Sequence, residues 1–380
     1  MPKRTPLYDR HVALGAKMTQ FAGWEMPVRY AGIIKEHDAV RQRAGLFDIC
    51  HMGQIEVRGE HATAVVQRVS TNDVSRLPVG KAQYSVMCRE DGGIVDDILT
   101  YRLAEDRLML VVNAANREKD YEWIKQVAAG LRAEGRYGPQ AGEAEVADIS
   151  DQTALLALQG PAAERVLQRL TNDDLSAIGR YWAAEVKLLG ALQALASRTG
   201  YAGEDGFEVY CSPADVGALW DAILDAGKDD GVVPCGLGAR DVLRLEAGLC
   251  LYGQDISEET NPLEAGLEWI VKCDSKPDFV GREALCRIKA QGTPQRLVGL
   301  HMEGSRIPRH GCMVLAEGER IGLVTSGTYS PSLDCPIALA YVRMPYAREG
   351  SVVEVSIGPR HEREPGRVVS KRLLDELNKH

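Results

Sequence analysis

Apolar and polar residues alternate most regularly between Lys81 and Asn113, and this alternation predicts three antiparallel strands. The strands are expected at residues 83–88, 94–103 and 107–113. Asp91, Gly92 and Gly93 lie between the first two strands, and glycine readily takes the positive φ that a tight hairpin turn needs. The segment is therefore expected to fold as a hairpin followed by a third strand.

Two adjacent carboxylates, Asp96 and Asp97, interrupt the apolar run of the second strand. Neighbouring residues of a strand point to opposite faces, so one of the two faces whatever the sheet covers. A buried carboxylate needs a partner or a function. Two interpretations remain open: both side chains lie in water at a strand edge, or one of them meets Tyr84, across the hairpin, and Asn113, at the end of the third strand.

Elsewhere the pattern predicts a mixed fold after an irregular stretch over residues 1–30. Helices are expected at 33–46, 61–69, 117–132, 162–170, 213–226 and 239–247, and another after Gly281. Strands are expected at 47–57, 146–150, 153–158, 185–189 and 193–198. The run 136–145 has the glycine, proline and charge of a linker. Short strands at 296–302, 312–315, 320–327, 337–342, 351–357 and 366–370 are typical of a small antiparallel barrel or sandwich.

Two further polar positions stand out. The loop from Thr199 to Glu208 contains three glycines and is either a plain turn or a hairpin that brings Tyr201 and Glu208 together. Arg240 falls in the first turn of a predicted helix, where a positive charge opposes the helix dipole. Arg240 is therefore either a surface residue or has an anionic or carbonyl partner.

Length and composition limit the class of protein. A chain of 380 residues with 45% hydrophobic and 26% charged residues is expected to form two or three globular domains. No window approaches eighteen apolar residues, and the N-terminus lacks the apolar core of a signal peptide, so no membrane partner is expected and the protein is expected in the cytoplasm. The formal net charge of −9 argues against a nucleic-acid partner.

Cysteine and histidine spacing argues against a metal site. The nine cysteines are scattered without a close pair, which favours reduced thiols, mostly in the core. The histidines form no metal-binding pair, and no phosphate-binding, dinucleotide-binding or nucleophile-elbow motif is present. The residues by themselves therefore indicate two mixed α/β units and a β-rich C-terminal unit, and they do not name a reaction.

Several longer segments occur in a specific order. They are TPLYDRHVALGAKMTQFAGWEMPV, GLFDICHMGQIEVRG, KAQYSVM, GGIVDDILTY, VVNAANREKD, TGYAGEDGFE, CGLGARDVLRLEAGLCLYGQDI and GLVTSGTYSPSLDCPIALAYV. With this number, order and spacing the chain resembles, essentially from end to end, the aminomethyltransferases of the glycine cleavage system, the folate-dependent T-proteins. Any one of these segments alone is weak evidence.

The resemblance implies an α+β fold in which three domains form a cloverleaf around a central folate pocket. The first α/β domain is expected to be discontinuous, with residues 1–52 and 146–270. The second α/β domain is expected at 53–145 and carries the hairpin. The C-terminal domain is expected to be a β-barrel at 280–375.

The resemblance also implies a reaction and its partners. Family members take an aminomethyl group from the lipoyl arm of the carrier, or H-protein, of the glycine cleavage system. They pass its carbon to tetrahydrofolate and release 5,10-methylenetetrahydrofolate, ammonia and the dihydrolipoyl carrier, without a metal. By motif, Asp97 matches the key acidic residue. The positions that match the folate pocket are Tyr84, Asn113, Tyr201, Glu208 and Arg240.

The chemistry of these residue types agrees with the implied roles. A carboxylate such as Glu208 can accept the adjacent ring N–H and amine of a pterin in a bidentate pair, and Arg240 can meet a carbonyl or carboxylate of the ligand. Tyrosines can stack or donate. Asp97 can stabilise a cationic, iminium-like carbon and move the proton of folate N5, whereas Asp96 is expected to support the structure.

Two other classes of protein are alternatives to this assignment. A non-catalytic folate-binding iron–sulfur maturation factor carries a Lys-Gly-Cys-rich motif that this sequence lacks. A folate-dependent demethylase or methyltransferase of the same superfamily is disfavoured by the free-standing chain, the absence of a flavin domain and the intact TSGTYSPSL segment. The ending KRLLDELNKH has no aromatic residue, unlike many relatives, so a contact of the tail with folate is left open.

Overall fold

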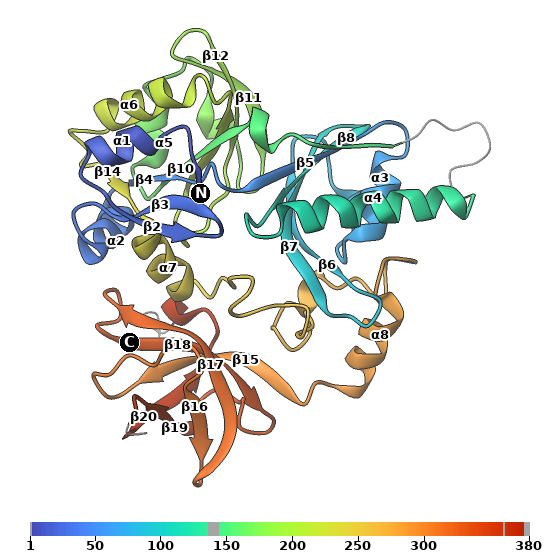
Figure 1. Ribbon diagram of the computed structural model, residues 1–380, viewed down its shortest axis with the longest axis vertical. Helices are drawn as coiled ribbons and strands as arrows, with labels where there is room; N and C mark the ends of the chain where they lie inside the picture. Colours follow the sequence, from blue (N-terminus) through green and yellow to red (C-terminus); the bar gives the residue numbers. More distant parts are fainter. Residues whose placement is uncertain (1, 136–143, 360–361, 376–380) are drawn as a thin grey trace. The chain divides into compact units, whose positions relative to one another are not determined.

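The structure is a computed structural model and describes residues 2–135, 144–359 and 362–375 (Figure 1). The chain divides into two compact units. The first contains the chain up to Ser85 together with Asp96–Arg240, and the second contains Val86–Val95 together with the chain from Asp241 onward. The predicted linker at 136–145 falls largely outside the described residues.

The N-terminal stretch is a small sheet with one helix, so the prediction that residues 1–30 are irregular is wrong. The elements are β1 (Lys3–Arg4), α1 (Tyr8–Ala13), β2 (Lys17–Phe21) and β3 (Trp24–Arg29), and the strand order is β1-β3-β2. The turn between β2 and β3 lies at Ala22 and Gly23, both with positive φ. Almost every residue of β2 is exposed, so no alternation marks it in the sequence.

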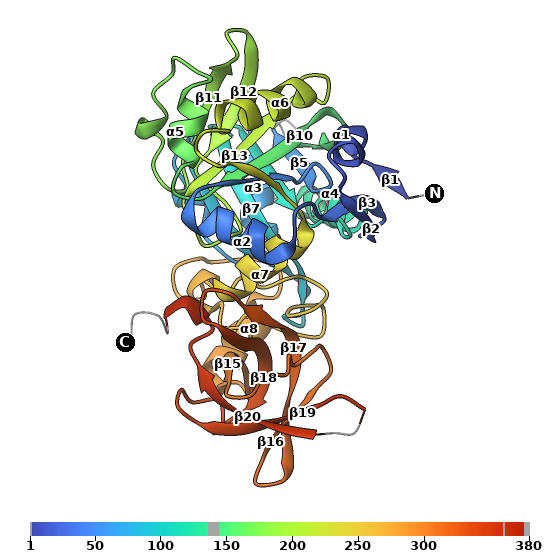
Figure 2. The same ribbon diagram turned by 90° about the vertical axis from the view of Figure 1, so that its left-hand side faces the viewer.

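A six-stranded sheet forms the main core of the first unit, with the order β11-β12-β13-β10-β4-β14. Figure 2 labels the strands β10, β11, β12 and β13 of this sheet. Its strands are β4 (Gly45–Asp48), β10 (Ala154–Gln159), β11 (Ala183–Leu188), β12 (Leu192–Ser197), β13 (Gly206–Cys211) and β14 (Val233–Cys235). The helices of this part are α2 (Ile33–Gln42), α5 (Ala163–Gln168) and α6 (Val216–Ala226). Helix α5 packs on β13 and α6 on β10, and Trp220 and Phe207 are fully buried in the core between them.

Helix α2 is shorter than predicted, ending at Gln42 instead of 46. The reason is that Gly45–Asp48 pairs as a strand with both β10 and β14. Gly45 packs against Val40 and Cys235 so closely that a Cβ would clash with both side chains. The tertiary pairing of this segment therefore overrides the local helical pattern.

A five-stranded sheet with the order β6-β7-β8-β5-β9 contains the predicted hairpin. Its elements are β5 (Gly53–Arg58), β6 (Ala82–Cys88), β7 (Ile94–Ala104), β8 (Arg107–Val112) and β9 (Glu145–Asp148), with helices α3 (Ala62–Val69) and α4 (Arg117–Ala133). The three strands predicted at 83–113 are confirmed to within one residue at each end. Val86–Val95, the tip of the hairpin, is grouped with the second unit.

The second unit contains a closed antiparallel barrel with the order β15-β18-β17-β16-β19-β20 (Figure 1). Its strands are β15 (Gln295–Met302), β16 (Met313–Ala316), β17 (Glu319–Ser330), β18 (Cys335–Arg343), β19 (Val352–Ile357) and β20 (Glu362–Val369). The other helical elements of the chain are α7 (Leu237–Glu246), α8 (Arg282–Gln291) and the short 3₁₀ turns η1 (Val74–Arg76), η2 (Ser150–Gln152), η3 (Leu175–Ala177) and η4 (Glu268–Ile270). The prediction of mixed α/β structure followed by a small antiparallel barrel is confirmed.

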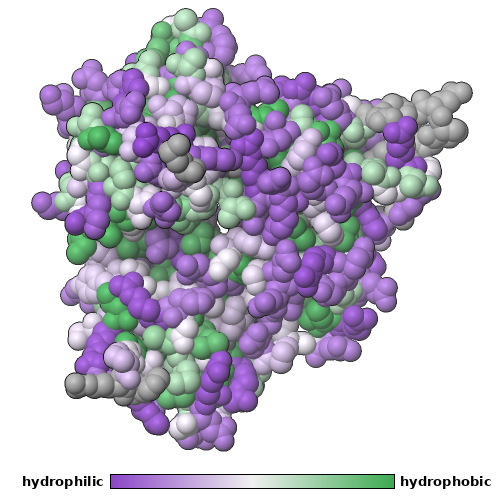
Figure 3. All heavy atoms as spheres, viewed as in Figure 1, coloured by the Kyte–Doolittle hydropathy of each residue, from purple (hydrophilic) through white to green (hydrophobic). Residues whose placement is uncertain are grey.

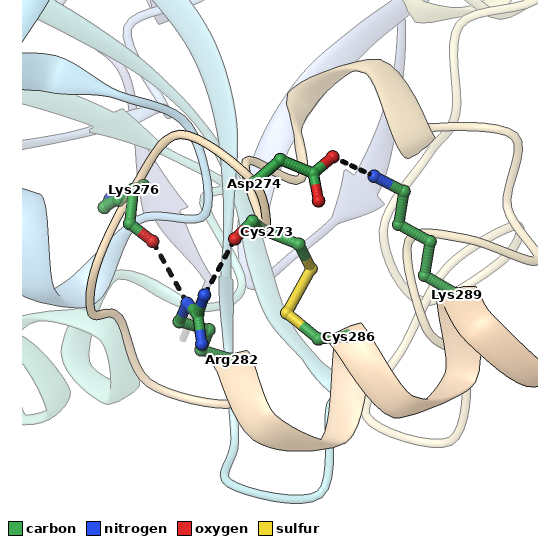
Figure 4. Close-up of a disulfide and its surroundings, with 6 residues drawn as sticks. All are labelled: Cys273, Asp274, Lys276, Arg282, Cys286 and Lys289. Carbon is green, nitrogen blue, oxygen red and sulfur yellow. Dashed lines mark hydrogen bonds and ion pairs between the residues drawn. A yellow bond between two sulfur atoms is a disulfide. The ribbon is translucent and has the colours of Figure 1, made fainter.

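One disulfide corrects the expectation that the cysteines are reduced. Cys273 is bonded to Cys286 of α8 (Figure 4), and the other seven cysteines form no disulfide. Arg282 holds the same turn by donating to the carbonyl oxygens of Cys273 (2.8 Å) and Lys276 (3.0 Å). The two cysteines are 13 residues apart and become neighbours only because the turn folds back on α8, so no short spacing marks them in the sequence.

No helix in the described part of the chain is both long and apolar enough to cross a bilayer. The face of the molecule in Figure 3 mixes hydrophilic and hydrophobic residues. Large apolar side chains that are exposed, such as Trp269 (56%) and Val352 (65%), belong to different elements. Single exposed apolar residues of this kind are usual on folded domains.

The turn at Gly160 gives a test of the first unit. Gly160 has φ +128°, and a Cβ there would meet the carbonyl oxygens of Val40 and Arg43. We expect Gly160→Ala to lower the free energy of unfolding by more than about 3 kcal/mol, since both strain and overpacking oppose it. Gly190 (φ +78°) faces open space, so Gly190→Ala is the control and should cost about 1–2 kcal/mol. Urea unfolding measures both, and equal losses would contradict the tight packing at Gly160.

Candidate functional site

Three of the predicted site residues meet on neighbouring strands of the five-stranded sheet. The Tyr84 hydroxyl, on β6, donates to Oδ2 of Asp97 at 3.0 Å. Nδ2 of Asn113 donates to Oδ1 of Asp97 at 2.8 Å. Leu99 pairs with Val111, and continuing that register by two residues sets Asn113 opposite Asp97. Phenol, carboxylate and carboxamide thus converge, as the second interpretation of the sequence expected.

Asp96 points to the opposite face and lies against the start of α4. It is fully buried, so the interpretation with both carboxylates in water is wrong. Its oxygens accept from the backbone N–H of Asn113 (2.9 Å), from Nδ2 of Asn113 (2.8 Å) and from Nδ2 of Asn116 (2.7 Å). The positive end of the helix dipole also favours a negative charge here. The two hydrogens of one carboxamide therefore join the two carboxylates.

The environment of Asp97 changes its acidity. Burial raises the pKa of Asp97 to about 7, and the neighbouring charge of Asp96 acts in the same direction. The hydrogen bonds from Tyr84 and Asn113 oppose this shift. Asp97 remains partly exposed, so it can exchange protons with a ligand or with water. A carboxyl group with a pKa near 7 is suited to general acid–base work at physiological pH.

The other three predicted residues form a second group. Ser197 of β12 pairs with Glu208 of β13, so the glycine-rich loop is the connection of a hairpin. The guanidinium of Arg240 lies over the ring of Tyr201, 4.7 Å from its centre. Burial raises the pKa of Glu208, while a hydrogen bond from Thr199 and the charge of Arg240 oppose the shift. Glu208 and Arg240 therefore influence each other electrostatically, although the guanidinium of Arg240 has no hydrogen-bond or salt-bridge partner among the described residues.

A chain of hydroxyl groups, which the sequence analysis missed, holds Glu208. Oγ1 of Thr199 donates to Oε2 of Glu208 at 2.6 Å, which uses its only hydrogen. Thr199 therefore accepts from the Tyr101 hydroxyl (3.1 Å), which in turn accepts from the Tyr210 hydroxyl (3.1 Å). Tyr101 lies on β7, four residues after Asp97, and strand alternation places both on one face. That spacing was the available signal for Tyr101.

A buried histidine near Arg240 was also missed. His51 follows β4, and the ring of Phe21 meets it edge-on at 5.8 Å between centroids. Burial lowers the pKa of His51 to about 4, so the imidazole is neutral at physiological pH; the charge of Arg240 adds to this shift and that of Asp48 opposes it. Asn116 was missed as well. It is the N-cap residue of α4, two residues before Glu118, the first acidic residue of that helix, and this position was the available signal.

The remaining features of the described residues do not add to this site. A groove in the second unit is lined by residues such as Tyr252, His310 and Tyr341 and contains none of the predicted site residues. Within the described residues, no group of three or more His, Cys, Asp or Glu side chains is arranged to hold a metal ion. The first unit therefore offers one carboxylate that can exchange a proton and a second carboxylate beside an arginine and a tyrosine.

Comparisons with known proteins cover nearly the whole chain. Two family models match, the GCVT N-terminal domain over residues 7–275 and the glycine cleavage T-protein C-terminal barrel domain over residues 295–375. The chain is 52% identical over 357 residues to an aminomethyltransferase of Geobacillus kaustophilus (strain HTA426), which covers 94% of this chain and 95% of that protein. It is 52% identical over 377 residues to an aminomethyltransferase of Symbiobacterium thermophilum, covering 98% and 96%.

One solved structure agrees with these matches. The crystal structure of glycine cleavage system aminomethyltransferase T from Bartonella henselae is similar with a TM-score of 0.89 and 36% sequence identity. The match covers 98% of each chain. The similarity in sequence therefore extends to the fold.

The raised pKa of Asp97 predicts how stability depends on pH. Because the folded pKa is about 7 and the unfolded value is about 4, the fold favours protonated Asp97. Its contribution to stability is present below pH 4 and is lost as the pH rises to 7. As the pH rises from 4 to 7, we expect the free energy of unfolding of Asp97→Asn to increase relative to that of the wild type by roughly 2–4 kcal/mol, because asparagine does not titrate. Denaturant unfolding at a series of pH values measures the difference.

Asp205 gives the matched control for this experiment. A hydrogen bond from Arg198 lowers the pKa of Asp205, so its contribution to stability is lost only as the pH falls below 4. Asp205→Asn should therefore differ from the wild type by the same amount at pH 5 and pH 7. A constant difference for Asp97→Asn over pH 4–7 would mean that its carboxyl is an ordinary acid.

Proposed function

The chain belongs to the glycine cleavage T-protein family, and from this premise we propose the reaction and the roles of its residues. The activity is that of an aminomethyltransferase. An aminomethyl group on the lipoyl arm of the carrier protein gives its carbon to tetrahydrofolate, which yields 5,10-methylenetetrahydrofolate, ammonia and the dihydrolipoyl carrier. The single observation that carries the proposal is Asp97, whose pKa is raised to about 7 between Tyr84 and Asn113.

Glu208, Tyr201 and Arg240 are proposed to bind the pterin end of tetrahydrofolate. Thr199 engages Oε2 of Glu208, and among the described residues Oε1 has no hydrogen-bond partner. The ring N–H and amine of a pterin offer two adjacent donors to such a carboxylate. The guanidinium of Arg240 lies over the ring of Tyr201 and forms no hydrogen bond to an anion among the described residues. A carbonyl or carboxylate of the ligand would therefore be its hydrogen-bond partner.

Asp97 is proposed to act at the reacting end, with Tyr84 and Asn113 holding it. Loss of ammonia from the S-aminomethyl group leaves a cationic carbon, and a carboxylate facing that carbon stabilises it. The carbon then bonds to folate N5, the carbon–sulfur bond breaks so that the sulfur leaves as a thiolate, and the carbon bonds to N10. Folate loses one proton from N5 and one from N10; one of them protonates the departing amine to ammonia and the other protonates the thiolate. A group with a pKa of about 7 can take up the proton that N5 loses and return it. Asp96 supports Asp97 and does not meet the substrate.

The finer calls on architecture and location are part of the same proposal. The domains are proposed to be 1–52 with 146–270, 53–145, and 280–375. The proposed partners are the lipoylated carrier protein and tetrahydrofolate, and the proposed location is the cytoplasm. These follow from the family and from the sequence patterns described above.

Glu208→Gln tests the binding role. Loss of a charged hydrogen-bonded contact should weaken tetrahydrofolate affinity by about 1.5–3 kcal/mol, while the fold survives. Calorimetric titration of the folded variant measures the change. Glu204, in the same loop, pairs with Arg41 at 2.9 Å, so Glu204→Gln is the control and should bind as the wild type does. Unchanged affinity in Glu208→Gln would remove Glu208 from the pocket.

Asp97→Asn tests the catalytic role against Asp96→Asn. Asp97→Asn keeps the shape but removes the charge, so turnover should fall by ~10²–10³ while tetrahydrofolate binding stays within a few-fold. The acid limb of the rate profile, near pH 7 in the wild type, should disappear. Asp96→Asn turns an amide toward three N–H donors and should reduce stability more than rate. Carrier-dependent formation of methylenetetrahydrofolate gives the rates, and control of turnover by Asp96 would refute the assignment.

A further inference from the structure

Asp120 is a buried acid that the proposed mechanism does not use. It lies in the first turn of α4 and is fully buried. Among the described residues neither of its carboxyl oxygens receives an N–H or O–H hydrogen bond. Asn116 brings it to Asp96, since Nδ2 of Asn116 donates to Asp96 at 2.7 Å and the carbonyl oxygen of Asn116 accepts from the backbone N–H of Asp120 at 2.8 Å. The carboxyl group of Asp96 is close enough that its charge and a hydrogen bond to it both raise the pKa of Asp120. A carboxylate in this position would be a buried charge without compensation, which proteins avoid.

Two carboxyl groups in contact can form a hydrogen bond only if one of them holds a proton. Two negative charges at about 4 Å repel each other by roughly 4 kcal/mol even at an effective dielectric constant of 20. Asp96 has three N–H donors at 2.7–2.9 Å and Asp120 has none. The negative charge therefore stays on Asp96 and the proton on Asp120. A carboxylate offers about four acceptor positions, and the Asp120 O–H fills the one that the amides leave.

We propose that Asp120 is a positioning residue, a neutral carboxylic acid that donates its proton to Asp96 and so fixes Asp96 and the Asn113 carboxamide that holds Asp97. Its effect on rate rests on the function proposed above. Its protonation does not, because that follows from the contact with Asp96 and the lack of other donors. Without the Asp120 O–H, Asp96 loses one of the hydrogen bonds that fix its carboxylate beside Asn113. The carboxamide shared by the two aspartates is then held less firmly.

The charges around Asp120 support a neutral acid. Burial raises the pKa of Asp120 to about 11, followed by the charge of Asp96; Lys119 of the same helix acts in the opposite direction, and Asp97 adds a smaller increase. The other charged groups on α4 and on the elements that pack against it form ion pairs elsewhere or are partly exposed. Arg117 pairs with Asp148 and Asp151, Glu56 of β5 pairs with Arg58 and Arg107, and Arg68 of α3 is partly exposed.

Infrared difference spectroscopy tests the protonation directly. The spectrum of the wild type minus that of Asp120→Asn should show the carbonyl band of a protonated carboxylic acid, both at pH 7 and at pH 8.5, where Asp97 is ionised. Absence of that band would overturn the proposal. Glu118, in the same turn of α4, is exposed, so Glu118→Gln is the matched control. The spectrum of the wild type minus that of Glu118→Gln should lack the band, because this variant keeps Asp120.

Rates test the positioning role. Asp120→Leu should lower kcat about tenfold or more, equivalent to at least about 1.4 kcal/mol, with tetrahydrofolate affinity little changed. Asp120→Asn supplies an N–H in place of the O–H, so it should rescue most of the rate and leave the midpoint of the acid limb where it is in the wild type. If Asp120 instead carries a charge, removing it would move that midpoint down by about one pH unit or more, and the proposal would fail.

The two proposals fail in different ways. If the wild type transfers no carbon from the aminomethyl carrier, the proposed function is wrong, while the infrared band still decides whether Asp120 is protonated. If the wild type is active but the leucine variant keeps its full rate, Asp120 has no positioning role. Should the leucine variant not fold, the asparagine variant alone still distinguishes a neutral acid from a charged one by the midpoint of its acid limb.

Discussion

Two adjacent carboxylates in one buried strand are the constraint on which the site in the first unit depends. Moving Asp96 and Asp97 out of water is unfavourable, and their mutual repulsion adds to that cost. Each hydrogen bond to a charged group stabilises it by about 1.5–3 kcal/mol, so three donors can outweigh a repulsion of roughly 4 kcal/mol between the two carboxylates. Asp96 has three N–H donors, which favour its charged form. Asp97 has two donors and a like charge beside it, and its pKa rises to about 7.

Local geometry supplies those donors. Strand alternation sends the two side chains to opposite faces, and the register of β7 with β8 sets Asn113 opposite Asp97. The chain turns into α4 directly after Asn113, which brings the helix start and Asn116 over Asp96. One short connection between a strand and a helix therefore serves both faces of β7. The same strand carries Tyr101 toward the hydroxyl groups that hold Glu208.

The parts of this fold that have a strong local pattern could be predicted from the sequence. Alternation and Gly92-Gly93 predicted the hairpin. The regular short strands predicted a small antiparallel barrel or sandwich, and the structure has a closed barrel. Strand geometry offered the meeting of Tyr84, Asp97 and Asn113 as one of two interpretations, and the hydrogen bonds of the structure decide in its favour. The N-terminal sheet could not be predicted because β2 is exposed and lacks alternation. The early end of α2 is set by the pairing of Gly45–Asp48 with strands from elsewhere in the chain.

Contacts between distant segments explain the other omissions. Thr199 reads as a loop residue until β7 brings Tyr101 beside it, 98 positions away in the sequence. Asp120 reads as an ordinary acidic residue in the first turn of a helix, where a surface carboxylate is common. Only its burial against Asp96 gives it another meaning. The Cys273–Cys286 bond likewise depends on a turn folding back on α8, and its spacing of 13 residues fits no short motif.

The environments of Asp97 and Glu208 suit them to different tasks. Both have a raised pKa because both are buried, but Glu208 faces the positive charge of Arg240 and lacks a second donor, whereas Asp97 faces the negative charge of Asp96. A pterin that donates two hydrogen bonds would supply what Glu208 lacks and lower its pKa, which fixes it as an anion in the complex. Nothing comparable relieves Asp97, because the charge of Asp96 persists. Such binding would hold Glu208 in its charged form and leave Asp97 able to exchange a proton, as the proposed chemistry requires.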